Sequence, residues 1–169
     1  MTLPRNRTSL KSRNIEPLTP EQVYQYALRL LTGRDYTVAR MAQKLLLREV
    51  TVPLVEETTL RLQREGWLDD RRYAARFAES ALSSGRFYGA RLRVEMRRRG
   101  FPADVIAETV APLLAECDEI SEARAATERR YPGFSYSAAS DRDKRRLVGF
   151  LQRRGFGFSA IMRALREED

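Results

Sequence analysis

Hydrophobic residues recur with one spacing at three places along the chain. In each copy an arginine precedes an apolar residue. Counted from that apolar residue, further apolar residues follow at four, nine and fourteen positions. The copies run from Arg40 to Val55, from Arg91 to Ile106 and from Arg146 to Ile161. The first two are offset by 51 residues (91 − 40) and the last two by 55 (146 − 91). A shared period of this size predicts tandem structural units that bury their apolar faces against one another.

Helix start and stop signals divide the first unit into three helices. Thr19, Pro20 and Gln22 form a capping-box pattern at the start of a first helix. Thr37 is placed to cap a second helix, and Thr51 precedes a third that a glycine at position 66 ends. Between these signals the apolar residues keep a helical period.

The second and third units repeat this division. Asp69 is placed to cap the fourth helix, and a turn at 85–89 leads to a helix over 91–99. The third unit is less regular, with a helix over 118–130 and a longer loop over 131–140 before its last two helices.

Strand signals are absent, so the sequence predicts an all-α protein of three tandem three-helix repeats in an elongated, curved array. We place a flexible basic arm at 1–18 and the three repeats at 19–66, 67–116 and 117–169. The arm carries basic residues and prolines but no apolar period.

Composition excludes several kinds of chemistry. The 169 residues contain no histidine and one cysteine, which removes the usual zinc, proton-shuttle and disulfide arrangements. No apolar run is long enough for a membrane span and no secretory signal precedes the repeats, so we expect a cytoplasmic protein without cofactors or a catalytic site. We interpret Cys117 as a buried or half-buried helix residue, Trp67 as a core residue and Asp69 as a cap rather than a metal ligand.

Positive charge is the strongest functional signal. The chain carries a net charge of +8, and the segments 86–99 and 142–154 each hold six basic residues and one acidic residue. A helical projection places Arg91 and Arg98 on one flank of the second helix of their unit. Arg146 and Arg153 are equivalent to this pair in the third unit. The full set of candidate binding residues is Arg91, Arg98, Arg146, Arg153, Arg93, Arg97, Arg99, Lys144, Arg145 and Arg154.

Arginine suits such a stripe because its planar guanidinium binds phosphates or carboxylates through paired hydrogen bonds. In the first unit the equivalent positions hold Arg40 and Leu47, so the basic stripe weakens toward the N-terminus. Solvated charge without a partner is the alternative reading of any single arginine.

Two segments of the second unit resemble the RecX family. They are 66–77, which contains Leu68-Asp69-Asp70, and 89–101, which ends in Gly100-Phe101. The opening of the first unit is also similar to that family. The resemblance implies three tandem three-helix units and a regulatory activity: RecX proteins bind RecA filaments on DNA and inhibit strand exchange, ATP hydrolysis and co-protease action. The chain departs from the family at Glu49-Val50, where a glycine is usual, and in the 131–140 loop.

We therefore expect a monomeric, non-enzymatic modulator of RecA filaments, with DNA as a further partner inside the filament and a role in recombination and the DNA-damage response. The alternative is a stand-alone DNA-binding protein of low sequence specificity, because the repeated helix offers arginines but few Asn or Gln residues for reading adenine. A helical hydrolase or nuclease lacks clustered metal ligands.

Overall fold

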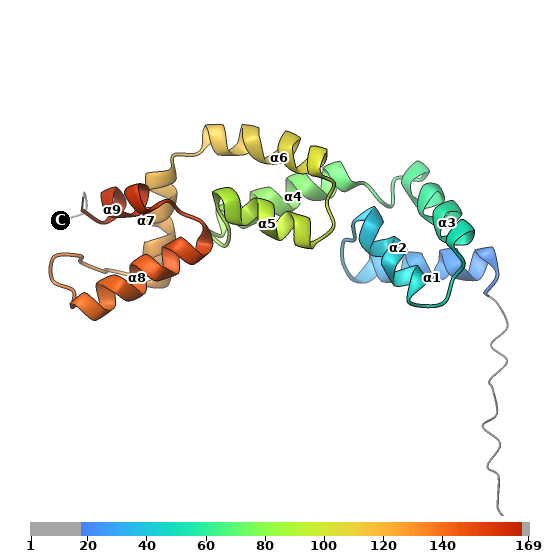
Figure 1. Ribbon diagram of the computed structural model, residues 1–169, viewed down its shortest axis with the longest axis horizontal. Helices are drawn as coiled ribbons and strands as arrows, with labels where there is room; N and C mark the ends of the chain where they lie inside the picture. The colour runs from blue at the N-terminus through green and yellow to red at the C-terminus, as the bar shows by residue number, and fades with distance from the viewer. Residues whose placement is uncertain (1–17, 167–169) are drawn as a thin grey trace, which may run out of the picture.

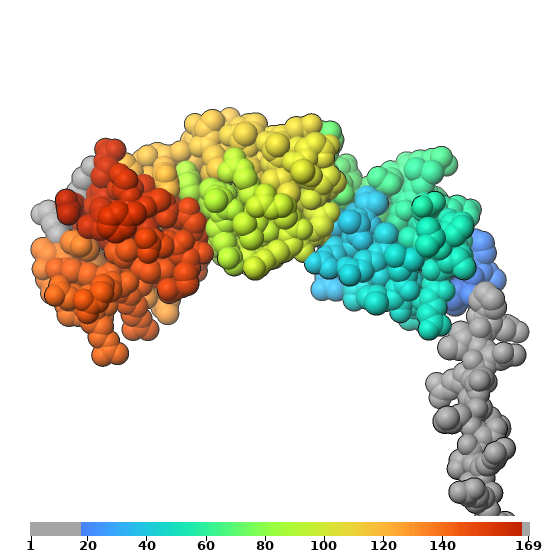
Figure 2. Space-filling view, viewed as in Figure 1, coloured from blue at the N-terminus to red at the C-terminus, as the bar shows by residue number. Residues whose placement is uncertain are grey.

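The computed structural model describes residues 18–166, and every regular element within them is a helix. Figure 1 shows these helices in an elongated arch, and the space-filling view in Figure 2 has the same curved outline. The predicted all-α repeat array is confirmed. The helices are α1 Pro20–Gly33, α2 Val38–Leu46, α3 Val52–Arg64, α4 Asp70–Ser83, α5 Gly89–Arg98, α6 Ala103–Glu116, α7 Glu119–Arg130, α8 Asp141–Arg154 and α9 Phe158–Arg166.

Most of the predicted helix starts are confirmed. Thr19 accepts a hydrogen bond from the backbone N–H of Gln22 and donates its own N–H to the Gln22 side chain, which completes the capping box. The side chains of Thr37 and Asp69 each accept a backbone N–H three residues further on. Thr51 occupies the cap position of α3, but its side chain makes no capping hydrogen bond. The predicted arm lies outside the described residues except for Leu18.

The repeated apolar positions form the core. None of them exposes more than 7% of its surface. The extensive helix contacts lie within α1–α3, α4–α6 and α7–α9. These buried positions are Met41, Leu45, Val50, Val55, Leu92, Met96, Phe101, Ile106, Leu147, Leu151, Phe156 and Ile161.

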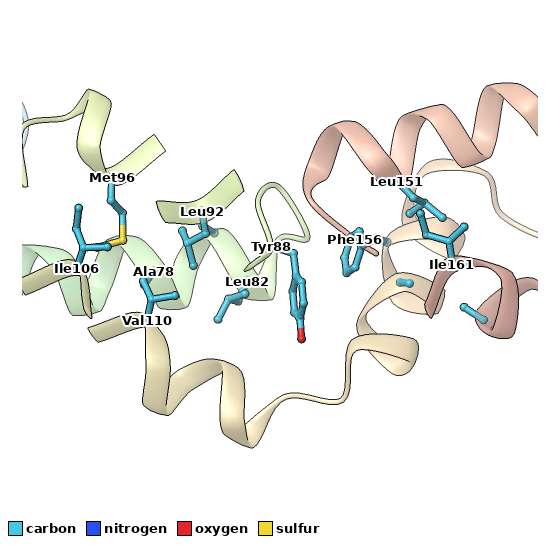
Figure 3. Packing of buried hydrophobic residues seen from close by; sticks show 14 of the residues in the cluster. Ala78, Leu82, Tyr88, Leu92, Met96, Ile106, Val110, Leu151, Phe156 and Ile161 are labelled. Atoms are coloured by element: carbon cyan, nitrogen blue, oxygen red, sulfur yellow. The ribbon is translucent and has the colours of Figure 1, made fainter. Parts of the chain in front are cut away.

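The buried residues form two clusters rather than three. One belongs to the first unit and includes Leu68, whereas the other runs without a break through the second and third units. Figure 3 shows the larger cluster, where Tyr88 of the second unit faces Phe156 of the third. The first unit therefore has a hydrophobic core of its own.

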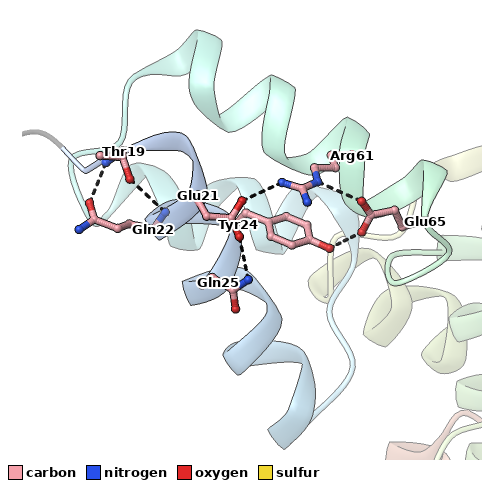
Figure 4. A network of polar contacts seen from close by, with 7 residues as sticks. All are labelled: Thr19, Glu21, Gln22, Tyr24, Gln25, Arg61 and Glu65. Atoms are coloured by element: carbon pink, nitrogen blue, oxygen red, sulfur yellow. Dashed lines mark hydrogen bonds and ion pairs between the residues drawn. The ribbon is translucent and has the colours of Figure 1, made fainter.

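A polar network joins α1 to α3 at the edge of the first unit (Figure 4). The Arg61 guanidinium lies 3.5 Å from the centroid of the Tyr24 ring and forms ion pairs with Glu21 at 3.2 Å and Glu65 at 2.9 Å. The Tyr24 hydroxyl donates to Glu65. The hydrogen bond from Tyr24 and the charge of Arg61 lower the pKa of Glu65 below its usual value. Exposed ion pairs are weak singly, but this network fixes two helices through one arginine.

The second helices of the three units, α8, α5 and α2, follow one another in that order along the array (Figure 1). At the junction of α5 with α2, the Thr37 hydroxyl donates to the carbonyl oxygen of Arg99 at 2.8 Å. The Arg40 guanidinium donates to the carbonyl oxygen of Arg98. The last carbonyl groups of a helix lack hydrogen-bond donors within that helix. At this junction the neighbouring unit supplies the donors.

The junction of α8 with α5 uses equivalent positions of the repeat. The Tyr88 N–H donates to the carbonyl oxygen of Arg154 at 2.7 Å, and Arg154 donates to the carbonyl oxygen of Gly85. The rings of Tyr88 and Phe156 stack with centroids 4.8 Å apart. Burial raises the pKa of Tyr88 to about 12. The three second helices thus run head to tail.

The prediction that Trp67 is a core residue is wrong, since its exposed fraction is 55%. Gly66 has a left-handed backbone with φ of 75°, and the chain turns there so that the neighbouring Leu68 enters the core of the first unit. The burial of Leu68 leaves Trp67 facing solvent.

The prediction for Asp69 is confirmed, and that for Cys117 is confirmed in its burial but wrong in its place, because Cys117 follows the last residue of α6 with an extended backbone instead of lying in a helix. Cys117 is half-buried, and burial raises the pKa of its thiol. Asp69 caps α4, whereas its neighbour Asp70 accepts the N–H of Val38 in the first unit at 2.9 Å. The paired carboxylates therefore serve two backbone N–H groups in different units.

Candidate functional site

The basic stripe of the second unit surrounds a buried carboxylate. Glu95 on α5 exposes only 8% of its surface and forms ion pairs with Arg91 at 2.6 Å, Arg98 at 3.3 Å and Arg99 at 3.1 Å. A buried charge requires such partners. Arg91 and Arg98 lie on the same side of the helix, as the helical projection predicts. The three guanidinium groups and the single carboxylate leave a local charge of +2 (3 − 1).

Besides Arg91, which Glu95 holds, two of the predicted binding residues have structural contacts instead of free guanidinium groups. Arg99 lies over the ring of Phe77, 4.3 Å from its centroid, in addition to its ion pair. Arg154 lies 4.4 Å from the centroid of Phe150 and also bridges to Gly85 across the unit junction. Burial and three neighbouring arginines lower the pKa of Arg154. These contacts hold the array together.

The remaining predicted residues present their charge outward. Arg98 exposes 65% of its side chain while it contacts Glu95. Arg93 is half-buried, and the Lys144 ammonium lies 5.0 Å from the centroid of the Tyr136 ring. None of the ion pairs found within residues 18–166 involves the four others, which are exposed: Arg97, Arg145, Arg146 and Arg153.

The first unit departs from this arrangement at the same positions. The Arg40 guanidinium donates hydrogen bonds to the carbonyl oxygen of Arg98 and, at 2.7 Å, to the Gln43 side chain. Leu47, at the position that Arg98 and Arg153 hold in the other units, exposes 74% of its surface. At this one position of the repeat, the exposed side chain is therefore arginine on α5 and α8 and leucine after α2.

Sequence reasoning missed the role of Glu95, although a signal for it was present. Arg91, Arg98 and Arg99 are four, three and four residues from Glu95, the separations at which helical side chains meet. The contact of Arg99 with Phe77 on α4 and that of Arg154 with the Gly85 carbonyl had no comparable local signal.

The chemistry of this surface is that of exposed cations. Among the described residues, no group of three or more His, Cys, Asp or Glu side chains could hold a metal ion. No helix of the described chain is long and apolar enough to cross a membrane. The exposed arginines can form charge-assisted hydrogen bonds with phosphates or carboxylates.

Comparisons with known proteins agree with this architecture. The family models for the first and third three-helix domains of RecX match residues 24–62 and 118–165. A solved structure, RecX from Lactobacillus salivarius, has the same fold with a TM-score of 0.69 at 17% sequence identity, over 88% of this chain and 95% of the other.

Sequence relatives extend over most of the chain. The regulatory protein RecX of Trichlorobacter lovleyi is 44% identical, covering 88% of this chain and 96% of the relative. That of Halorhodospira halophila is 36% identical over 88% of this chain and 89% of its own length. From these matches and the fold, the chain belongs to the RecX family of regulatory proteins.

Proposed function

We propose that this protein binds RecA recombinase filaments on DNA and inhibits their recombinase, ATPase and co-protease activities, without catalysing a reaction itself. The observation that carries this function is the row of exposed arginines on α5 and α8, in a chain of the RecX family. An elongated body with a repeated charged surface can follow a helical filament and contact several of its protomers. A monomer suffices for such contact.

The contacts described above divide the candidate residues by role. Arg91, Arg99 and Arg154 are engaged by Glu95, aromatic rings or a carbonyl group, so we assign them to positioning the surface. We assign direct contact with phosphates or carboxylates of the filament to the exposed Arg97, Arg98, Arg145, Arg146 and Arg153, with Arg93 and Lys144 beside them.

The decisive experiment compares binding to DNA alone with binding to RecA-coated DNA at matched salt. The proposed function requires a large preference for coated DNA and slower ATP hydrolysis by preformed filaments at less than one molecule per RecA protomer. Equal affinity for bare and coated DNA would instead favour a stand-alone DNA-binding protein. Unchanged hydrolysis over a wide range of ratios would contradict inhibition.

A pair of charge reversals tests the surface itself. Arg146→Glu with Arg153→Glu should weaken filament binding strongly, whereas Arg29→Glu with Arg64→Glu, a matched change on exposed residues of the first unit, should not. If the two arginines contact phosphates, the salt slope should fall by roughly 1.4 to 1.8, from about 0.7 to 0.9 per contact. An unchanged slope with weakened binding would assign them to carboxylates. Wild-type binding by both double variants would remove the surface from consideration.

A further inference from the structure

A groove lies at the junction of the first and second units, away from the exposed arginines of α8. It encloses about 460 Å³ and opens to solvent. This size lies within the usual range of ligand sites, roughly 300 to 1,000 Å³. Its walls come from the 34–37 segment, α2, α4 and the end of α5.

The groove is cationic. Five of its lining residues carry positive charge and only Asp35 carries negative charge. Arg76 forms an ion pair with Asp35 at 2.7 Å, so that carboxylate is neutralised from outside the groove. Lys44 is exposed and takes part in none of the ion pairs of the described residues. The cationic residues are Arg34, Arg40, Lys44, Arg98 and Arg99.

The aromatic rings of the groove are already covered. Tyr36 exposes 9% of its surface, and the Arg34 guanidinium lies over its ring at 4.8 Å. Tyr73 packs against Phe101 with ring centroids 4.8 Å apart. Proteins that bind single-stranded nucleic acid stack bases on free aromatic faces. These two rings do not offer such faces, which argues against a nucleic acid in this groove.

The rim of the groove carries an apolar residue where the basic stripe would continue. Leu47 lines the groove and exposes 74% of its surface, whereas the equivalent residues of the other units are Arg98 and Arg153. Exposed leucine beside cations matches a ligand that combines carboxylates with an apolar side chain. A peptide has both, and a phosphate backbone does not.

We propose that this groove binds a short acidic peptide segment of a partner protein. Its carboxylates would lie against Arg34 and Lys44, and an apolar side chain would pack on Leu47. This site goes beyond the function proposed above, since it requires neither DNA nor the arginines of α8.

The test uses the full chain and a fluorescein-labelled ten-residue peptide of Glu and Asp with two central Leu residues. Fluorescence anisotropy measures its affinity, and two competitors are compared: the same peptide with Ser in place of Leu, and an oligodeoxythymidine of equal charge. The variants are Arg34→Glu with Lys44→Glu, and Leu47→Ser. Arg29→Glu with Arg64→Glu is the matched control, and melting curves confirm that every variant folds. Arg40 is left intact because it bridges the two units.

We expect both test variants to weaken peptide binding, the charge reversal by about tenfold or more, with the control unchanged. The Leu-containing peptide should bind more tightly than either competitor. Three results would overturn the site: no binding of the peptide, equal affinity of wild type and Leu47→Ser, or tighter binding of the oligonucleotide. Filament binding, measured separately, stays a test of the proposed function alone.

Discussion

The two junctions between units use equivalent positions of one repeat but differ in what holds them together. Between the first and second units the contacts are polar, from Thr37 to the Arg99 carbonyl and from Arg40 to the Arg98 carbonyl, and the hydrophobic clusters stay separate. Between the second and third units the Tyr88 and Phe156 rings stack within one continuous cluster. Head-to-tail geometry therefore does not require a shared core.

The residues that end the second helices show how closely each unit approaches the next. Glu49, Gly100 and Gly155 are equivalent (49 + 51 = 100; 100 + 55 = 155), and all have left-handed backbones. A Cβ atom on Gly155 would lie 2.2 Å from the carbonyl oxygen of Tyr88. On Gly100 it would lie 3.0 Å from the Thr37 hydroxyl. The second and third units are therefore the more tightly docked pair.

Replacing each of the two glycines by alanine tests the difference between the junctions most directly. Gly155→Ala adds left-handed strain of about 1 to 3 kcal/mol and a clash with backbone that cannot move aside, so we expect a loss of roughly 3 to 6 kcal/mol. Gly100→Ala has the same strain with a side-chain neighbour, and should cost roughly 1 to 3 kcal/mol. Urea unfolding of both variants measures the difference. Equal losses would mean that the two junctions are equally close in solution.

The separate clusters also predict separate opening. The first unit should unfold locally while the second and third remain folded, because opening the polar junction exposes little apolar surface. Hydrogen exchange should then give Met41 and Leu45 amides at least tenfold less protection than Leu92 and Leu151, or about 1.4 kcal/mol. Equal protection in all three units would show a single cooperative body.

Much of this architecture is local and could be predicted from the sequence. Helix caps such as Thr19 and Asp69, and the apolar period from Met41 to Ile161, depend on neighbours within a few residues. The same reasoning places Arg91 and Arg98 on one side of α5, and both contact Glu95 there. The boundaries at 66/67 and 116/117 stay a proposal.

The remainder depends on which unit covers a residue, and a helical projection carries no such information. Trp67 is exposed because Leu68 fills the core in its place. Arg154 is in the candidate set because of its charge. In the structure, however, its guanidinium donates a hydrogen bond to the carbonyl oxygen of Gly85 in the neighbouring unit. Long-range packing therefore separates positioning arginines from those free to bind a partner.

A smaller effect is expected at Glu49, the first-unit counterpart of the two glycines. Its φ of 61° is costly for a residue with a side chain. Among the described residues, no other non-glycine residue has a positive φ. Glu49→Gly should therefore stabilise the first unit by about 0.5 to 1 kcal/mol, since relief of strain outweighs the added freedom of the unfolded chain. Hydrogen exchange of α2 amides measures it, with Glu56→Gly, inside α3, as the destabilising control. A loss of protection in Glu49→Gly would contradict the strain.

The smallest effect concerns the pH dependence of the polar junction. Burial raises the pKa of Asp70 above its ordinary value of 3.8, and the negative charge of Asp69 adds to this rise. The hydrogen bond from the Val38 N–H acts in the opposite direction but does not cancel it. The folded protein then holds this proton more tightly than the unfolded chain does, so its stability contribution is complete below pH 3.8 and declines as pH rises through the folded-state pKa.

Asp70→Asn removes that titration but keeps a carbonyl oxygen for the Val38 N–H. We expect the stability of the variant relative to wild type to increase from pH 3.5 toward pH 7, measured by urea unfolding at several pH values. Asp104→Asn, which removes an exposed carboxylate at the start of α6, controls for the loss of one negative charge. A difference that is constant with pH, or that declines as pH rises, would mean that Asp70 stays charged at the junction without penalty.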